Sequence, residues 1–157
     1  MAGHAPHFEI PQLSGARAVI ISARWHREIC QTMVQGAKRA LHEAGINNPS
    51  EVEVAGSFEL PLAAKFALES GADLAVVLGV VVRGETPHFD YVCQGVTDGI
   101  MKLSLELGKP IGFGVLTVDN VDQAVARSGG IGSKEDKGFD SAIAALDLLR
   151  LKRNFSR

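Results

Sequence analysis

The sequence has few cysteines, few aromatic residues and no long hydrophobic run. Only two cysteines, Cys30 and Cys93, occur in 157 residues, and neither belongs to a Cys-x-x-Cys pair. We therefore expect no disulfide framework and no thiolate metal site, but two reduced cysteines packed within helices. No apolar stretch approaches the roughly 20 residues of a membrane-spanning helix. The opening residues, MAGHAPHFEIPQ, also lack the order of a signal peptide. These absences favour, by default, a cytoplasmic protein without a membrane partner.

The charge of the chain is nearly balanced, with a formal net charge of −2. Nothing in this balance favours nucleic acid or an anionic membrane as a partner. A hydrophobic content of 46% can fill the core of one domain of this length. We expect that domain to cover residues 17–157. Residues 1–16 are interrupted by proline and glycine and predict an N-terminal arm, which would lie on a neighbouring subunit. His4 and His7 in this arm have no carboxylate or thiol partner nearby, so they are not expected to bind a metal.

Four apolar segments predict strands, and amphipathic segments between them predict helices. The expected strands are 17–23, 51–55, 73–82 and 110–118. The expected helices start after His26 and continue to Ala44, then cover 60–69, 88–107, a short turn ending at Ala126, and 136–153. Alternation of this kind predicts an α/β fold, a three-layer αβα sandwich whose four-stranded parallel sheet has right-handed crossovers. A flavodoxin-like strand order 2-1-3-4 is expected.

Polar and aromatic residues follow each predicted strand, at the sheet edge where ligands bind in such folds. They are Trp25, then Ser57, Phe58 and Glu59, then the residues from Arg83 to His88, then those from Thr117 to Asn120. An aromatic ring, a carboxylate, an anion-binding turn and a histidine would meet there. This combination suits a flat polar heterocycle together with a phosphate group.

The turn after the third strand predicts a helix start. Thr86 is the expected N-cap, and Pro87 the first helical residue. His88 then lies in the first helical turn, where free N–H groups and the helix dipole favour anions and a neutral, proton-accepting imidazole.

Each of these residues also has an ordinary structural explanation. A lone tryptophan such as Trp25 is more often a core residue, Glu59 could simply favour a helix N-terminus, and His88 could be structural. Their coincidence at one sheet edge favours a binding site.

Three other classes of α/β protein fit poorly. A flavodoxin-type carrier needs a phosphate loop after the first strand, where Arg24, Trp25 and His26 stand instead. A phospho-receiver needs an acidic pair after the first strand and an acceptor aspartate at the end of a later strand, and Val82-Arg83 offers none. A dinucleotide fold needs G-x-G-x-x-G after a strand, and that motif is absent.

The segment GVVVRGETPHFDYVCQGVTDGI closely resembles the signature of lumazine synthases, the penultimate enzymes of riboflavin biosynthesis. Further segments fall in the order and spacing of that family, so the resemblance covers residues 15–153. They are ARWH at 23–26, GSFELP at 56–61, GFGVLT at 112–117 and EDKG at 135–138.

The resemblance implies condensation of 5-amino-6-(ribitylamino)uracil with 3,4-dihydroxy-2-butanone 4-phosphate. The products are 6,7-dimethyl-8-ribityllumazine, phosphate and water, and neither a cofactor nor a metal is used. The resemblance implies that His88 is the catalytic residue. The resemblance also implies two sets of substrate-binding residues. Those for the uracil substrate are Trp25, Ser57, Phe58, Glu59, Val80, Val81, Val82 and Phe113. Those for the butanone phosphate are Gly84, Glu85, Thr86, Arg127 and Lys137. The position of Phe113 varies in the family, and the loop from Arg127 to Lys137 looks longer than in some members.

The resemblance also implies a homo-oligomer built from pentamers with sites at the subunit interfaces, and it raises riboflavin synthase as a candidate partner. Two features of the sequence agree with sharing of sites. Arg127 and Lys137 follow the fourth strand, away from the turn after the third strand. Tyr91, Met101 and Leu105 lie off the apolar stripe of helix 88–107, which therefore has a second surface to bury. The alternative function is that of a catalytically weak paralogue that binds lumazine or flavin.

Overall fold

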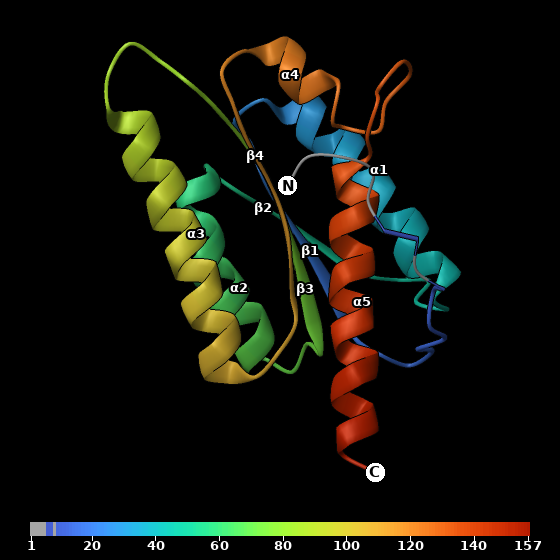
Figure 1. The fold of residues 1–157 in the computed structure, drawn as a ribbon. Coiled ribbons are helices and arrows are strands. Elements are labelled where there is room, and N and C mark those ends of the chain that lie inside the picture. Colours follow the sequence, from blue (N-terminus) through green and yellow to red (C-terminus); the bar gives the residue numbers. More distant parts are fainter. Residues whose placement is uncertain (1–5, 8) are drawn as a thin grey trace.

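The computed structural model describes residues 6–7 and 9–157 as three layers, a parallel sheet between two pairs of helices (Figure 1). The strands are β1 (Ala18–Ala23), β2 (Ser50–Val54), β3 (Leu74–Val82) and β4 (Ile111–Val118). The helices are α1 (Arg27–Glu43), the short 3-10 helix η1 (Ser57–Glu59), α2 (Leu60–Glu69), α3 (His88–Leu107), α4 (Val121–Val125) and α5 (Lys137–Phe155). Helices α2 and α3 cover one face of the sheet, and α1 and α5 cover the other.

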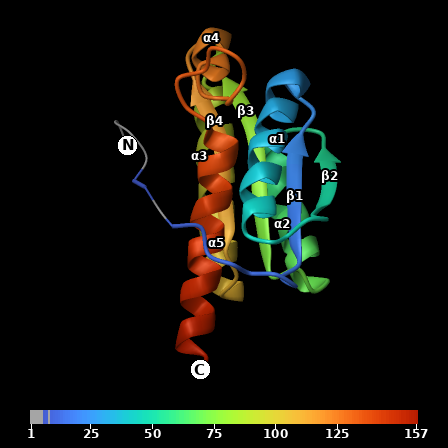
Figure 2. The same ribbon diagram turned by 90° about the vertical axis from the view of Figure 1, so that its right-hand side faces the viewer.

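The sheet has the order β2-β1-β3-β4, and every neighbouring pair is parallel. Figure 2 shows β2 at one edge of this sheet. The predicted α/β fold and strand order are confirmed. Strand β3 lies in the interior of the sheet, and its residues from Leu74 to Val80 are all buried. This burial on both faces explains why its sequence is an unbroken apolar run.

The order of the strands creates a gap at their carboxyl ends. Strand β1 pairs with β3 only as far as Ser22 opposite Leu78, whereas β3 continues beside β4 to Val82. The chain leaves β1 towards β2 on one side, and β3 lies on the other side. The gap between β1 and β3 is therefore the topological switch point, where ligands bind in doubly wound sheets.

The start of α3 differs from the prediction. The helix begins at His88 with Pro87 as its N-cap, and no side chain provides a cap hydrogen bond. Thr86 is therefore not the N-cap, and Pro87 is not the first helical residue. The reason is that the Pro87 carbonyl accepts the first hydrogen bond of the helix, from the Asp90 N–H at 2.9 Å, although Pro87 itself has helical dihedral angles, φ −63° and ψ −5°. The first turn thus starts from the carbonyl of Pro87 instead of that of Thr86.

The described part of the N-terminal segment contacts the body of its own chain. Leu13 and Ala16 are buried in the core between the sheet and the α1–α5 layer. The Leu13 N–H donates to the Ala44 carbonyl at 2.8 Å. Residues 1–5 and 8, including His4, lie outside the described residues, so the predicted arm is covered only in part. In the part of the chain that the structure describes, no helix has the length and apolar character needed to cross a membrane.

Candidate active site

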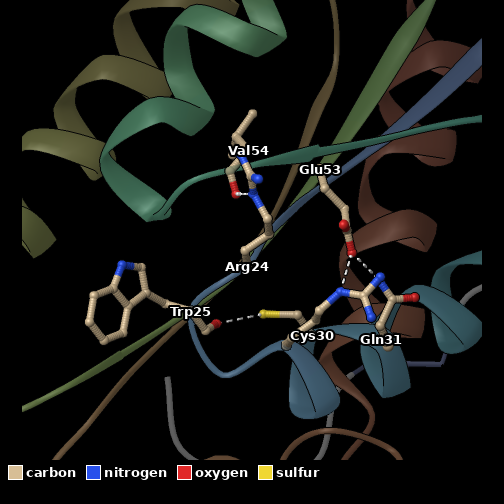
Figure 3. A network of polar contacts seen from close by, with 7 residues as sticks. Arg24, Trp25, Cys30, Gln31, Glu53 and Val54 are labelled. Carbon is tan, nitrogen blue, oxygen red and sulfur yellow. Dashed lines mark hydrogen bonds and ion pairs between the residues drawn. The ribbon is translucent and has the colours of Figure 1, made fainter.

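Trp25 follows β1 and projects from a turn that other residues fix (Figure 3). The Arg24 N–H donates to the Val54 carbonyl at 2.9 Å, which ties the turn to β2. The Cys30 thiol donates to the Trp25 carbonyl at 3.5 Å. Burial raises the pKa of this thiol to about 11, so it keeps its proton at neutral pH. His26 completes the turn with a left-handed backbone, φ 54°.

The indole ring itself is not part of this network. Trp25 is 72% exposed, and Figure 3 shows its ring pointing away from the polar contacts that fix its backbone. A Cβ on Gly56 would come within 3.1 Å of the ring, so the ring lies beside the backbone that leads into η1. The explanation of Trp25 as a core residue is therefore wrong.

Helix η1 places Ser57 against β3. The Ser57 side chain is 5% exposed, and its hydroxyl has no hydrogen-bond partner among the described residues. It lies directly over Gly79, where an added Cβ would be only 2.3 Å from the hydroxyl oxygen. A buried hydroxyl without a partner costs free energy, about 1–3 kcal/mol. Such a group at the β1–β3 gap is consistent with a site that a polar ligand completes.

Phe58 and Glu59 follow Ser57 in the sequence but have different surroundings. Phe58 is 61% exposed, and one ring edge packs where α3 has Gly95. One oxygen of the Glu59 carboxylate accepts from the Gly56 N–H at 2.8 Å. Glu59 thus has the structural role at a helix start that its position suggested, and its role towards substrate stays a prediction.

At the end of β3, backbone groups rather than side chains are available to a ligand in the β1–β3 gap. Val80 and Val82 pack towards the α1–α5 layer, and Val81 packs towards the α2–α3 layer. On the β4 side, the three valines pair with residues from Leu116 to Val118. On the β1 side, the pairing has already ended at Leu78. Any contact of these valines with a ligand in the gap would therefore use their backbone.

Arg83 braces the turn that follows β3. Its guanidinium contacts Asp119 at 3.1 Å and Asp90 at 3.4 Å, and lies 4.3 Å from the ring centroid of Phe89. The hydrogen bond to Asp119 is the main cause that raises the pKa of Arg83. The Arg83 N–H also donates to the Val118 carbonyl at 2.9 Å. Arg83 thus links β3, α3 and the end of β4, and these contacts hold the two ends of the turn after β3 in place.

The turn itself is open. Glu85, Thr86 and His88 are exposed, and a Cβ added to Gly84 would meet no atom within 4 Å. The first turn of α3 has no side-chain cap, which leaves its N–H groups available to an anion.

The remaining predicted residues lie elsewhere, along the edge of β4 that no strand covers. Phe113, Arg127 and Lys137 line one cavity of about 360 Å³ there, together with Thr117 and Gln123. Sequence reasoning missed Gln123, although its spacing of four residues from Arg127 on a helical segment was a usable signal. The structure thus separates the predicted residues into two groups. The first group, from Trp25 to His88, surrounds the β1–β3 gap and the turn after β3, and the second group lies on the outer edge of β4.

The two cations of the second group are held side by side. The Lys137 N–H donates to the Arg127 carbonyl at 3.0 Å. The Arg127 guanidinium donates to the Gln123 carbonyl at 2.9 Å, and no carboxylate pairs with it among the described residues. The Lys137 ammonium contacts Glu135 at 2.6 Å and Asp140 at 3.5 Å. The hydrogen bond to Glu135 is the main cause that raises the pKa of Lys137, so this side chain is cationic at neutral pH.

Residues 15–153 match the family model of 6,7-dimethyl-8-ribityllumazine synthase. The chain belongs to this family. A 6,7-dimethyl-8-ribityllumazine synthase of Streptomyces coelicolor is 48% identical over 152 residues, which cover 97% of this chain and 94% of that protein. One from Kineococcus radiotolerans is 49% identical over 143 residues, covering 91% and 88%. One from Leifsonia xyli is 52% identical over 133 residues, covering 85% and 84%. The function predicted from the resemblance is confirmed at this level: the chain is a lumazine synthase of riboflavin biosynthesis.

Proposed function

We propose that this lumazine synthase forms each active site from two subunits of a head-to-tail homo-oligomer. The reaction condenses 5-amino-6-(D-ribitylamino)uracil with 3,4-dihydroxy-2-butanone 4-phosphate and gives 6,7-dimethyl-8-ribityllumazine, phosphate and water. The observation that carries the proposal is the separation of the two groups of predicted residues. A ring in which the β4 edge of one chain faces the β1–β3 gap of the next would unite them.

The uracil substrate fits the β1–β3 gap. The exposed indole of Trp25 provides a face on which a flat heterocycle can stack. The Ser57 hydroxyl, which has no partner among the described residues, and the Glu59 carboxylate would bind hydroxyls of the ribityl chain, and Phe58 would close one side. The free backbone groups of residues 80–82 complete the contacts to the ring. Phe113 from the adjacent subunit would cover the opposite face of the ligand.

The phosphate of the second substrate fits the turn of Gly84, Glu85 and Thr86. The N-terminus of α3 provides unpaired N–H groups and the positive end of the helix dipole. Glu85 would act through its backbone N–H, with its carboxylate directed away from the phosphate. Arg127 and Lys137 of the adjacent subunit would supply the balancing positive charge.

His88 acts as the proton shuttle in this proposal. It is exposed in the first turn of α3, directly after the phosphate turn. Imine formation and phosphate elimination both need protons moved at atoms next to the leaving group. A general acid–base group of this kind contributes typically about 10²–10⁴-fold to the rate. Because both substrates are intrinsically reactive, much of the remaining acceleration would come from holding amine and ketone together.

The surface of the chain supports assembly. An apolar groove of about 540 Å³ lies between α3, the start of β4 and α5, and Phe113 lines both this groove and the cavity of Arg127 and Lys137. Met101 and Leu105 line the groove from α3 and are 59% and 75% exposed. A subunit interface that covered this groove would continue without interruption into the shared site. A pentameric ring, a cytoplasmic location and an association with riboflavin synthase are part of the same proposal, and the family resemblance is their support.

Mixed refolding of two inactive variants tests the shared site. Arg127→Ala removes a cation from one half of the site, and Thr86→Ile disturbs the phosphate turn in the other half. In rings refolded from an equal mixture, roughly a quarter of the interfaces would pair two intact halves. We expect lumazine fluorescence to develop at about that fraction of the wild-type rate.

The control is a chain that carries both substitutions, mixed with an equal amount of wild-type chain at the same total concentration. Its rings also contain one quarter of intact interfaces, so the two mixtures should agree. If the two single variants form mixed rings of normal size but remain inactive, each site is formed within one subunit and the proposal is wrong.

A further inference from the structure

The carboxylate of Asp136 connects the loop before α5 to helix α1. Its Oδ1 accepts from the Phe139 N–H at 2.9 Å and caps α5. Its Oδ2 accepts from the guanidinium of Arg39 on α1. Asp136 immediately precedes Lys137, so one side chain joins the start of α5, the preceding loop and a neighbouring helix.

Three glycines make this connection sterically possible. A Cβ on Gly36 of α1 would lie 2.3 Å from Asp136 Oδ1, and a Cβ on Gly129 would lie 2.3 Å from Asp136 Cγ. Gly138 packs so closely on α1 that a Cβ there would lie 2.0 Å from the Met33 carbonyl oxygen. The carboxylate therefore occupies a fitted space between α1 and the loop, and its side chain is 23% exposed.

The backbone around Asp136 is hydrogen-bonded to the segment that contains Arg127, which links Asp136 to both cations of the β4 edge. Ser128 and Asp136 form an isolated antiparallel bridge. On one side of it, the Gly129 N–H donates to the Glu135 carbonyl at 3.0 Å, and on the other, the Lys137 N–H donates to the Arg127 carbonyl at 3.0 Å. Arg127 and Lys137 are thus the residues next to the bridge on its two strands, and both line the 360 Å³ cavity.

We propose that the Arg39–Asp136 ion pair positions Arg127 and Lys137 for the phosphate of 3,4-dihydroxy-2-butanone 4-phosphate. This inference rests on the proposed function, because it assigns the phosphate to those two cations. Arg39 also neutralises a carboxylate that stands one residue from Lys137 and would otherwise oppose a bound phosphate. Neither Arg39 nor Asp136 lines the cavity, so both act through other residues and are positioning residues.

The expected consequence is weaker binding of one substrate only, the butanone phosphate. In Arg39→Met the carboxylate keeps its capping role but loses its tie to α1. We expect the KM for the butanone phosphate to rise about tenfold, and the KM for the uracil substrate to stay near its wild-type value. The inhibition constant of inorganic phosphate should rise in parallel, and this measurement needs no change in turnover. Arg39→Lys, which keeps the charge, should recover most of both values.

Lys38→Met is the matched control. Lys38 lies next to Arg39 on α1 and forms an ion pair of similar exposure, with Glu51 at 2.6 Å, but this pair faces β2. It should leave both KM values unchanged. Asp136→Asn provides a second test, because the amide oxygen can still cap α5 while the charge is lost. It should show the same selective rise in KM.

The outcomes separate this inference from the proposed function. If Arg127→Ala raises the KM for the butanone phosphate but folded, assembled Arg39→Met and Asp136→Asn do not, the positioning role is refuted and the phosphate site stands. If Arg127→Ala also leaves that KM unchanged, both are refuted. An equal rise of both KM values in Arg39→Met would indicate a general structural role and would refute the positioning role as well.

Discussion

Among single residues, Trp25 shows how the chain separates a structural role from a binding role within one side chain. The preceding Arg24 N–H is bonded to β2 and the Trp25 carbonyl accepts from the Cys30 thiol, while the indole remains exposed. Ser57 shows the converse arrangement, because its side chain is buried against Gly79 and still lacks a hydrogen-bond partner. An exposed ring and an unpartnered hydroxyl at the same gap are both unfavourable in an isolated domain. Both are useful if a ligand with a flat ring and hydroxyl groups binds there.

Replacement of Trp25 by alanine should therefore affect binding and leave stability almost unchanged. We expect the KM for the uracil substrate to rise by an amount equivalent to about 1–3 kcal/mol, the range for stacking of a base on an aromatic side chain. Because the ring is 72% exposed, the melting temperature should change by no more than a degree or two. Phe66→Ala, which removes a ring that is 62% exposed on α2 and lines neither the apolar groove nor the cavity of Arg127 and Lys137, is the control and should change neither value. A fall of many degrees with an unchanged KM would identify Trp25 as a structural residue.

Two of the residues that sequence reasoning missed, Arg39 and Asp136, share a physical cause. Side chains at strand ends could be assigned to the site because parallel strands end at one edge. Asp136 and Arg39 could not, because they are 97 residues apart and their contact depends on how closely α1 and α5 cross. The capping role of Thr86 was wrongly predicted because Thr-Pro allows the helix to start from either residue, and here the Pro87 carbonyl accepts the first bond, from the Asp90 N–H.

Among the elements, the position of β4 against α5 depends on glycine. A Cβ on Gly112 would lie 2.3 Å from the Ser141 carbonyl oxygen, so the strand can approach the helix backbone only without a side chain there. The apolar periodicity of each segment was sufficient to predict every helix and strand to within two residues, apart from the single turn η1. It could not predict such close approaches, because they are properties of a pair of elements.

Gly112→Ala should separate β4 from α5. The cost of forcing an extra methyl group into a packed interface is about 1–3 kcal/mol, which corresponds to a fall of several degrees in melting temperature for a chain of this size. Gly130→Ala is the matched control, since its nearest contact would be the Thr32 methyl group at 3.3 Å, a much smaller overlap than at Gly112. Scanning calorimetry of both variants would measure the difference. Equal melting temperatures would mean that β4 and α5 shift at little cost.

For the whole molecule, the two groups of site residues lie at different places on one sheet. The β1–β3 gap holds the first group, and the outer edge of β4 holds the second. In the proposed ring, a single chain has a complete fold but an incomplete site. Catalysis would then depend on assembly, although folding would not.

A charge in the apolar groove should reveal this dependence. Leu148 lines the groove and is 49% exposed, so Leu148→Glu should disturb the interface while leaving the fold of the single chain intact. We expect light scattering to show dissociated chains at low protein concentration, with normal far-ultraviolet circular dichroism and activity reduced about tenfold or more. Higher protein concentration should restore activity and assembly together. Asn154→Glu, at an exposed position of the same helix that does not line the groove, is the control. Full activity in chains that scatter as monomers would contradict the shared site.

The interior position of β3 also has a consequence for synthesis on the ribosome. Translation completes β3, the nine residues of Leu74–Val82, well before its partner β4, which begins at Ile111. During that interval, the nascent chain carries an extended apolar segment whose backbone groups on one side have no partner. Segments of this composition and exposure are prone to pair with other chains. Once β4 has emerged it can pair with that side, so we expect the nascent chain to be exposed to such pairing mainly between synthesis of its third and fourth strands.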